Sequence, residues 1–196
     1  CETFGSYNVG PDVEITCVDS CITLTAPQVA DVAAGGTDYA VEEIEYAPPY
    51  PFTQGTTAIN IGDDTYAGNI PIGFTFNFYG NNYTTCKLAS NGFLTFDQGE
   101  TAPYNPNGSI PANTLALNAI MAVYSDINPS TCGNIKYFTT GNAPCRKLVA
   151  NWNNVCQFSC TTNIVTAQIV LYEGSNAIEI YLDSRHLSCI LRVICV

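Results

Sequence analysis

The chain has 196 residues, 46% of them hydrophobic, which is enough for one large folded domain and argues against a wholly disordered protein. The formal net charge at pH 7 is −11, and all six Lys and Arg residues lie at or after Lys87. Because phosphate groups are bound by basic side chains, this composition excludes nucleic acids and anionic lipids as expected partners, but it permits divalent cations or a basic partner.

The first part of the chain divides into a cysteine-containing segment and the start of a larger domain. Residues 1–30 contain three cysteines and are interpreted as a separate stapled segment or an added strand, with residues 31–196 as the β-sandwich domain. The proline-rich residues 46–52 cannot form a central strand, because proline has no backbone N–H. We expect this stretch to run extended across the surface.

Residues 72–96 show the alternation that is typical of β-strands on either side of tight turns. Three phenylalanines between positions 74 and 78 alternate with other residues, which predicts a half-buried strand. The motif Tyr-Gly-Asn-Asn-Tyr follows at positions 79–83, and its glycine and asparagines tolerate the positive φ angles that hairpins require. We therefore predict a hairpin tip at this motif and a second turn at Ser-Asn-Gly, residues 90–92.

The rest of the chain also favours strands. The apolar residues 115–124 fit a helix or a buried strand, and the neighbouring strands favour the latter. Residues 147–155 predict a strand that carries Trp152, and residues 168–173 and 177–182 predict a second hairpin. Together these elements predict an all-β fold, a disulfide-stapled β-sandwich with a jelly-roll-like architecture.

The cysteine content indicates an oxidising compartment. An even set of cysteines in a chain with few charges is typical of disulfide-bonded extracellular proteins, whereas structural zinc usually shows Cys-x2-Cys spacing. Local closure of each Cys-x3-Cys pair is one option, and the sequence leaves the pairing open. An acylated Cys1, as in lipoproteins, is the alternative to its role in a disulfide. The disulfide candidates are Cys1, Cys17, Cys21, Cys86, Cys132, Cys145, Cys156, Cys160, Cys189 and Cys195.

No stretch of the sequence approaches the ~18 apolar residues of a membrane-spanning helix. The sequence does not start with a signal peptide, so a secreted protein would be present here in its mature form or as a truncated chain.

The order of several motifs resembles a family of extracellular modules. These modules occur in large surface and adhesin-like proteins of Bacteroidetes that are linked to gliding motility and type IX secretion, and the middle part is distantly similar to the nidogen-type domain. The match covers roughly residues 38–183 and includes YAPPYPF (46–52), DDTY (63–66), IGFTFNFYGNNY (72–83), SNGFLTF (90–96), LNAIMAVYSDINPS (117–130), APCRKLVANWNNV (143–155) and TAQIVLYEGSNAIEIYL (166–182).

The resemblance implies an exported, non-enzymatic β module on a cell surface or in a matrix, without catalytic residues to carry over. The residues after position 183 depart from the Gly-rich continuation that such modules would show.

The sequence offers little for catalysis. His186 is the only histidine, and the sequence contains no nucleophile-elbow motif with which it could form a catalytic site. This disfavours hydrolase chemistry. Glu42, Glu43 and Glu45 are clustered, but a solvated edge strand explains them better than the paired carboxylates of a glycosidase. We therefore expect no enzymatic activity.

Two kinds of binding site are compatible with the sequence. Asp63, Asp64 and Asp126 place carboxylate ligands in loops, where they could hold calcium or cap turns. Tyr50 and Phe52, on the proline-rich stretch, are the best exposed candidates for an aromatic platform that binds carbohydrate, and Trp152 is another candidate. Otherwise no cofactor is expected.

We expect a secreted structural or adhesive protein of the cell surface, whose partner is itself or a surface polysaccharide or protein. The β-branched C-terminal residues 190–196 could add to the sheet edge of a neighbouring copy and so build an extracellular fibre. The alternative is a carbohydrate-binding module of a larger adhesin.

Overall fold

A computed structural model describes residues 38–58, 61–101, 115–123 and 125–185. The predictions for residues 1–30, for His186 and for residues 190–196 lie outside these ranges, as do those for Cys1, Cys17, Cys21, Cys189 and Cys195. No residue within the described ranges is in a helix, so these ranges hold no helix that could cross a membrane.

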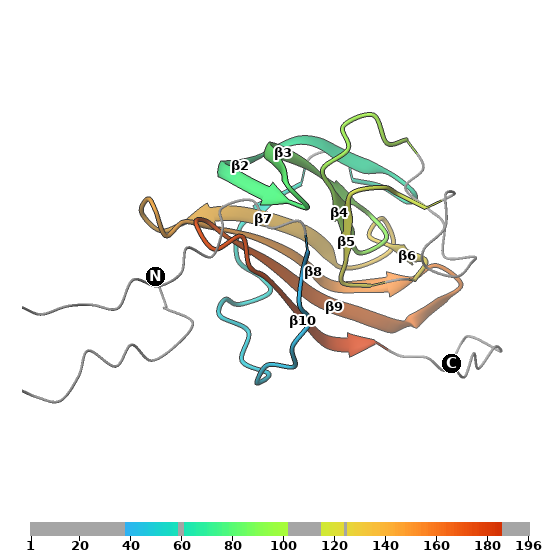
Figure 1. Ribbon diagram of the computed structural model, residues 1–196. Helices are drawn as coiled ribbons and strands as arrows, with labels where there is room; N and C mark the ends of the chain where they lie inside the picture. The colour runs from blue at the N-terminus through green and yellow to red at the C-terminus, as the bar shows by residue number, and fades with distance from the viewer. Residues whose placement is uncertain (1–37, 59–60, 102–114, 124, 186–196) are drawn as a thin grey trace, which may run out of the picture.

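Two antiparallel β-sheets are stacked face to face (Figure 1), which confirms the predicted sandwich. The smaller sheet has the strand order β2–β3–β4–β5, and the larger sheet has the order β1–β7–β8–β9–β10 with β6 paired to β8. The smaller sheet contains β2 (Tyr66–Phe78), β3 (Asn81–Ala89), β4 (Phe93–Thr95) and β5 (Ala119–Met121). The larger sheet contains β1 (Thr56–Thr57), β6 (Ile127–Asn128), β7 (Asn134–Thr140), β8 (Lys147–Gln157), β9 (Cys160–Tyr172) and β10 (Ile178–Arg185).

The connectivity is simpler than that of a jelly roll. Strands β2 to β5 are neighbours in chain order, and so are strands β7 to β10, so each sheet is built around a meander. A jelly roll would instead follow two Greek keys, with long connections between the sheets. Short turns join β2 to β3, β3 to β4 and each of β7, β8 and β9 to the next strand, so these strands pair with the ones before them, whereas β4 and β5 pair across the longer connection of residues 96–118.

The motif at positions 79–83 forms the tip of the β2–β3 hairpin, as predicted. Phe78 pairs with Asn81, which leaves Tyr79 and Gly80 as a two-residue turn. Their φ angles of 47° and 81° are the positive values that a type I′ turn requires at both central residues. The asparagines that follow belong to β3, so the left-handed conformation lies on Tyr79 and Gly80.

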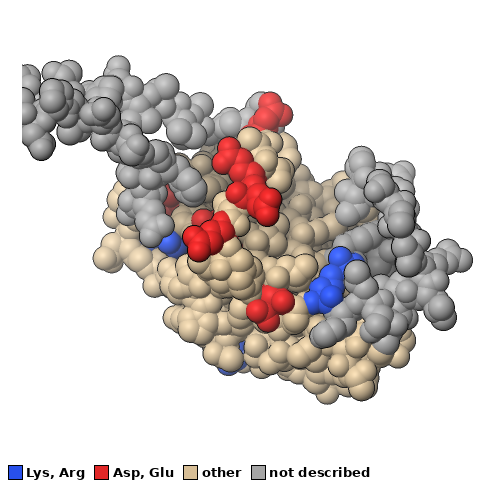
Figure 2. Space-filling model, turned by 90° about the horizontal axis from the view of Figure 1, so that it is seen from below, with Lys and Arg blue, Asp and Glu red and all other residues tan. Residues whose placement is uncertain are grey.

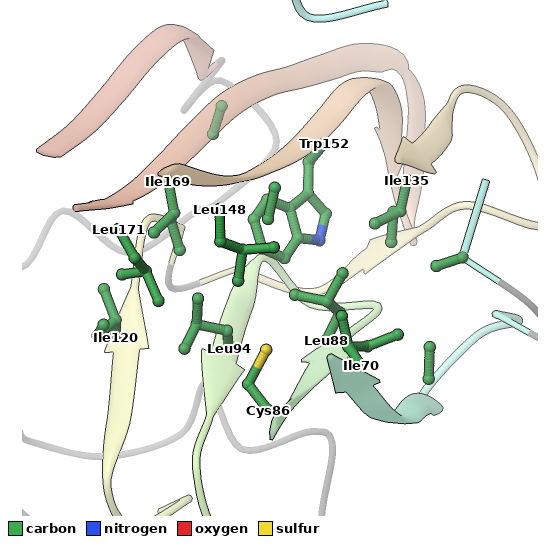
Figure 3. Packing of buried hydrophobic residues seen from close by; sticks show 14 of the residues in the cluster. Ile70, Cys86, Leu88, Leu94, Ile120, Ile135, Leu148, Trp152, Ile169 and Leu171 are labelled. Carbon is green, nitrogen blue, oxygen red and sulfur yellow. The ribbon is translucent and has the colours of Figure 1, made fainter. Parts of the chain in front are cut away.

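The side chains between the sheets form one apolar core (Figure 3). Trp152 of β8 is fully buried, and its indole N–H donates a hydrogen bond of 3.0 Å to the backbone oxygen of Ala89 in the opposite sheet. Each large apolar side chain that is fully buried contributes about 1.5–3 kcal/mol. The labelled core residues of Figure 3 come from both sheets: Ile70, Cys86, Leu88, Leu94, Ile120, Ile135, Leu148, Trp152, Ile169 and Leu171.

Cys86 is a correction to the predicted disulfide set. Its side chain points into the core from β3 and carries a free thiol. Burial raises the pKa of this thiol to about 12, so the group behaves as a small apolar side chain.

The outer face of the larger sheet is also partly covered. Residues 46–54, which we call the strap, cross this face, as expected for the proline-rich stretch. Val149, Val170 and Tyr181 are buried beneath it in a second, smaller apolar cluster. The strap therefore gives the larger sheet a thin cover on the side away from the core.

The face of strand β10 that was expected to be buried is the more exposed one. The alternation is as predicted, but Tyr181 on the outer face is buried, whereas Ile180 and Leu182 on the inner face are 41% and 39% exposed. Ile178 at the start of the strand still packs against the main core. The smaller sheet thus leaves the inner face of β10 largely uncovered.

The predicted strand at residues 115–124 is shorter than expected. Only β5 is a strand, Leu117 is 56% exposed, and Tyr124 lies outside the described residues. Strand β7 was not predicted, because Tyr137 and Phe138 are adjacent and break the alternation after Ile135.

Candidate functional site

Three aspartates from two parts of the chain form the carboxylate cluster: Asp63, Asp64 and Asp126. One carboxylate oxygen from each lies within 4.8 Å of the others. Asp63 and Asp64 occupy a turn just before β2, and Asp126 immediately precedes β6. The fold therefore brings together the three residues that the sequence singled out for calcium.

A buried amide connects the two parts of the cluster. The side-chain N–H of Asn91 donates to Asp64 Oδ1 at 2.8 Å, and its side-chain oxygen accepts from the backbone N–H of Ile127 at 2.9 Å. Ser90, beside Asn91, accepts a hydrogen bond from the backbone N–H of Thr65 at 3.0 Å. The Ser-Asn-Gly turn thus holds both sides of the cluster in place.

The electrostatics of the carboxylate cluster are unfavourable when all three groups are ionised. Asp63 Oδ1 and Asp126 Oδ1 are buried and have no hydrogen-bond partner. Burial, followed by the negative charges of Asp64 and Asp63, raises the pKa of Asp126 to about 6. Burial and the charge of Asp64 also raise the pKa of Asp63. No described Lys or Arg forms an ion pair with these carboxylates.

These properties fit a hard divalent cation. Calcium takes six to eight oxygen ligands at about 2.3–2.6 Å, often from carboxylates in loops, and the two unpartnered oxygens are available as ligands. Protonation of Asp126 would relieve the same repulsion without a metal. Calcium binding therefore stays a prediction.

The aromatic residues predicted to bind carbohydrate are less exposed in the structure than expected. Tyr50 and Phe52 lie on the strap and are both half-buried. The Tyr50 ring packs edge-on against Phe138 with centroids 5.3 Å apart, and its backbone oxygen accepts a hydrogen bond of 2.9 Å from Gln168. Trp152 is in the core and presents no surface. Tyr50 thus helps to fasten the strap to the sheet.

A group of tyrosines that the sequence analysis missed lies on the outer face of β9 and β10. Glu179 accepts hydrogen bonds from the hydroxyl groups of Tyr172 at 2.5 Å and Tyr181 at 2.9 Å. The Tyr46 hydroxyl donates to Asp183 at 2.8 Å, and burial together with Asp183 raises the pKa of Tyr46 to about 12. The alternation of Glu179 and Tyr181 along one strand was the signal for this group.

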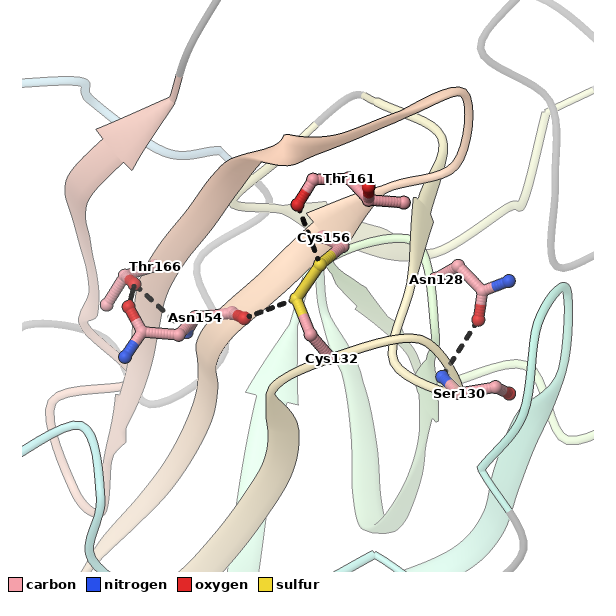
Figure 4. The surroundings of a disulfide bond; sticks show 7 residues. All are labelled: Asn128, Ser130, Cys132, Asn154, Cys156, Thr161 and Thr166. Carbon is pink, nitrogen blue, oxygen red and sulfur yellow. Dashed lines mark hydrogen bonds between the residues drawn. A yellow bond between two sulfur atoms is a disulfide. The ribbon is translucent and has the colours of Figure 1, made fainter.

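One disulfide joins Cys132, in the loop after β6, to Cys156 in β8 (Figure 4). Local closure of Cys156 with Cys160 is therefore wrong, because the β6–β8 pairing places Cys132 beside Cys156. Cys145 and Cys160 are also disulfide-bonded. The 24-residue separation of Cys132 and Cys156 corresponds to about 3.5 kcal/mol of stabilisation in the loop-entropy model.

The candidate catalytic carboxylates do not gather into a site. Glu42, Glu43 and Glu45 are all exposed, and no strand is assigned to their segment, in contrast to the predicted edge strand. Figure 2 shows the molecule from the side of the larger sheet, with acidic side chains more prominent than basic ones.

A family model described as "NIDO related" matches residues 38–188, which is most of the chain. The chain belongs to the NIDO-related family. This finding supports the distant nidogen-like resemblance and covers all ten strands of the sandwich. No curated protein and no solved structure matches the chain. Together with the disulfides, membership of the NIDO-related family indicates an extracellular domain.

Proposed function

We propose that this NIDO-related domain is a non-enzymatic structural or adhesive module of a cell surface that assembles into a fibre by strand addition. The observation that carries this proposal is the edge strand β10. It has eight residues without Pro or Gly, and it exposes Ile180 and Leu182. A long edge strand of this kind is a template for pairing with another chain unless it is protected.

Other features support a surface role. The disulfides suit an oxidising exterior, and the low content of basic residues suits a protein that does not bind nucleic acid. The motif order resembles Bacteroidetes surface proteins linked to type IX secretion, which is the setting that we propose for this chain.

The experiment that tests assembly is negative-stain electron microscopy of the purified protein without reductant. Ordered fibres are expected. Monodisperse particles at all protein concentrations would contradict the proposal.

The second candidate function is carbohydrate binding by the same module. It is favoured by Tyr46, which is 53% exposed, beside Tyr172, Tyr181 and the carboxylate of Glu179. Aromatic rings next to carboxylates suit the apolar and hydroxyl faces of sugars. A glycan array tests this function: binding that is lost in Tyr46→Ala supports it, and an array without hits removes it.

A further inference from the structure

We infer that the outer face of the larger sheet binds an uncharged oligosaccharide, whose hydroxyl groups hydrogen-bond to Glu179 and Lys147 while one of its sugar rings packs on Tyr46. This inference rests on the second candidate function, carbohydrate binding. It names the polar residues that would recognise the glycan, and the size and charge of the glycan.

Glu179 is held in place with one carboxylate oxygen open to a ligand. The hydroxyl groups of Tyr172 and Tyr181 both donate to its Oε2, at 2.5 Å and 2.9 Å. Its other oxygen, Oε1, makes no hydrogen bond with the described residues and is not buried. Because the two tyrosines already fix the carboxylate, a ligand hydroxyl could donate to Oε1 without first ordering the side chain.

Lys147 places a hydrogen-bond donor on the same face. It pairs with Tyr172 across β8 and β9, and its ammonium nitrogen lies 4.6 Å from the centroid of the Tyr172 ring. Among the described residues this ammonium makes no ion pair and no hydrogen bond. Its N–H groups are therefore free to donate to the hydroxyl oxygens of a ligand.

Tyr46 offers an apolar surface for a sugar ring. Its side chain is 53% exposed, although its hydroxyl group donates to Asp183 at 2.8 Å and its ring lies edge-on to Tyr181 with centroids 6.2 Å apart. These two contacts fix the ring without covering it. A fixed, exposed aromatic ring suits the C–H face of a sugar.

The distance between these groups indicates a ligand longer than one sugar. On β9, Tyr172 pairs with Lys147 of β8, whereas Gln168, four residues earlier, pairs with Tyr181 of β10. With about 3.3 Å per residue along a strand and about 4.8 Å between strands, Lys147 and Tyr181 are about 16 Å apart. Several linked sugar rings are needed to reach from Lys147 to Tyr46, which lies against Tyr181.

The charges on this face favour an uncharged ligand. The carboxylates of Glu179 and Asp183, together with the net charge of −11, would repel an acidic polysaccharide. A basic peptide would meet the ammonium group of Lys147, and it would compete with the hydroxyl groups that already bind Glu179. Sugar hydroxyls both donate and accept, so they fit the acceptor on Glu179 and the donor on Lys147 together.

The test is an array that carries neutral and acidic glycans of graded length, with polylysine spots for the basic alternative. The wild type is expected to bind neutral oligosaccharides, more strongly as the chain lengthens to several sugars, and not the corresponding monosaccharides. A preference for acidic glycans or for polylysine would overturn the inference.

Point variants then locate the site with the neutral glycan that binds best. Lys147→Met removes the ammonium group and Glu179→Gln removes the carboxylate charge, and each should weaken binding about tenfold. Lys147→Arg keeps a charged donor and should retain binding. Lys87→Met is the matched control, because Lys87 makes the same kind of contact in the smaller sheet, 4.5 Å from the centroid of the Tyr66 ring. It should bind like the wild type.

The outcomes separate this inference from the function on which it rests. Thermal unfolding shows that each variant is folded. Binding that is lost in Tyr46→Ala but unchanged in Lys147→Met and Glu179→Gln would overturn the inference and leave carbohydrate binding standing. An array on which the wild type binds no glycan would remove both.

Discussion

Asn91 shows how one residue can organise a site that spans two sheets. Its amide is 4% exposed and makes hydrogen bonds to Asp64 on one side and to the backbone of Ile127 on the other. A buried amide with both ends bonded fixes the position of its partners, because breaking either bond leaves a polar group unpaired. The carboxylate cluster is therefore held in a geometry that the charges alone would not adopt.

The pKa of Asp126 predicts how stability depends on pH in metal-free buffer. Its folded-state value of about 6 lies above the ordinary 3.8, so the folded state holds a proton that the unfolded state releases. Stability should therefore fall as pH rises from about 4 to above 6. At pH 7.5, Asp126→Asn should be more stable than the wild type by about 1 kcal/mol after allowance for solvent screening, and near pH 3.5 the difference should vanish. Urea unfolding at both pH values checks this, and parallel pH curves would contradict it.

Bound calcium should offset the loss of folding stability that the ionised carboxylate cluster causes. At 100 times its dissociation constant, a bound ion would raise the free energy of unfolding by about 2.7 kcal/mol, seen as an increase in Tm. The increase should occur in the wild type and in Glu42→Gln, an exposed-acid control, and should be absent in Asp126→Asn. The measurement is thermal unfolding with calcium chloride against EDTA at pH 7.5. An equal response in all three proteins would exclude a site at this cluster.

Gly92 is required by both its conformation and its surroundings. Its φ is +84°, and a Cβ at this position would lie 2.5 Å from Cβ of Val123. We expect Gly92→Ala to lower the free energy of unfolding by about 2–4 kcal/mol. Gly68→Ala is the control, because its nearest contact would be 3.9 Å away, and it should change stability by less than about 0.5 kcal/mol. Urea unfolding compares the two, and equal effects would refute the explanation.

At the scale of elements, the strap depends on two buried amides in the larger sheet. Gln168 donates to the backbone oxygen of Tyr50 at 2.9 Å, and Asn151 donates to that of Gln54 at 3.0 Å. The two amides also bond to each other at 2.7 Å. The strap is thus fixed by hydrogen bonds from these two side-chain amides to its backbone oxygens, as well as by the packing of Tyr50 on Phe138.

We predict that Gln168→Ala loosens the strap. The hydrogen bond of about 1 kcal/mol that Gln168 donates to the strap is lost, so cleavage by chymotrypsin after Phe52 should be about fivefold faster. Mass spectrometry of the fragments measures the rate at this bond. Gln98→Ala, at an exposed glutamine, should leave it unchanged. Unaltered cleavage in Gln168→Ala would show that the amide does not hold the strap.

The elements also show what the sequence can and cannot predict. Local signals were enough for the β2–β3 and β9–β10 hairpins, because turn residues and alternation lie within a few positions of one another. The exposure of Ile180 and Leu182 depends on how far the smaller sheet reaches, and the burial of Tyr50 depends on the approach of Phe138. Neither the reach of the smaller sheet nor the approach of Phe138 can be read from the residues next to these positions in the sequence. The carboxylate cluster was predictable as residue types, but its assembly across two sheets was not.

At the scale of the whole molecule, the proposed assembly depends on which long edge of the sandwich could take an added strand. The β2 edge is bonded to side chains of other strands and turns, whereas β10 pairs with β9 alone among the described strands and exposes Ile180 and Leu182. An apolar edge strand that accepts a strand from the next copy would allow identical copies to join head to tail. Such a heterologous contact gives an open filament when the rotation between copies does not close a ring.

The most direct measurement is amide hydrogen exchange of residues 178–185 in the assembled wild type and in Leu182→Lys, which should stay unassembled because it puts a charge into the exposed apolar row of β10. If a strand is added at this edge, the β10 amides that point away from β9 should be protected in the assembled form and should exchange rapidly in the variant. Equal exchange of these amides in the two forms would contradict strand addition at β10.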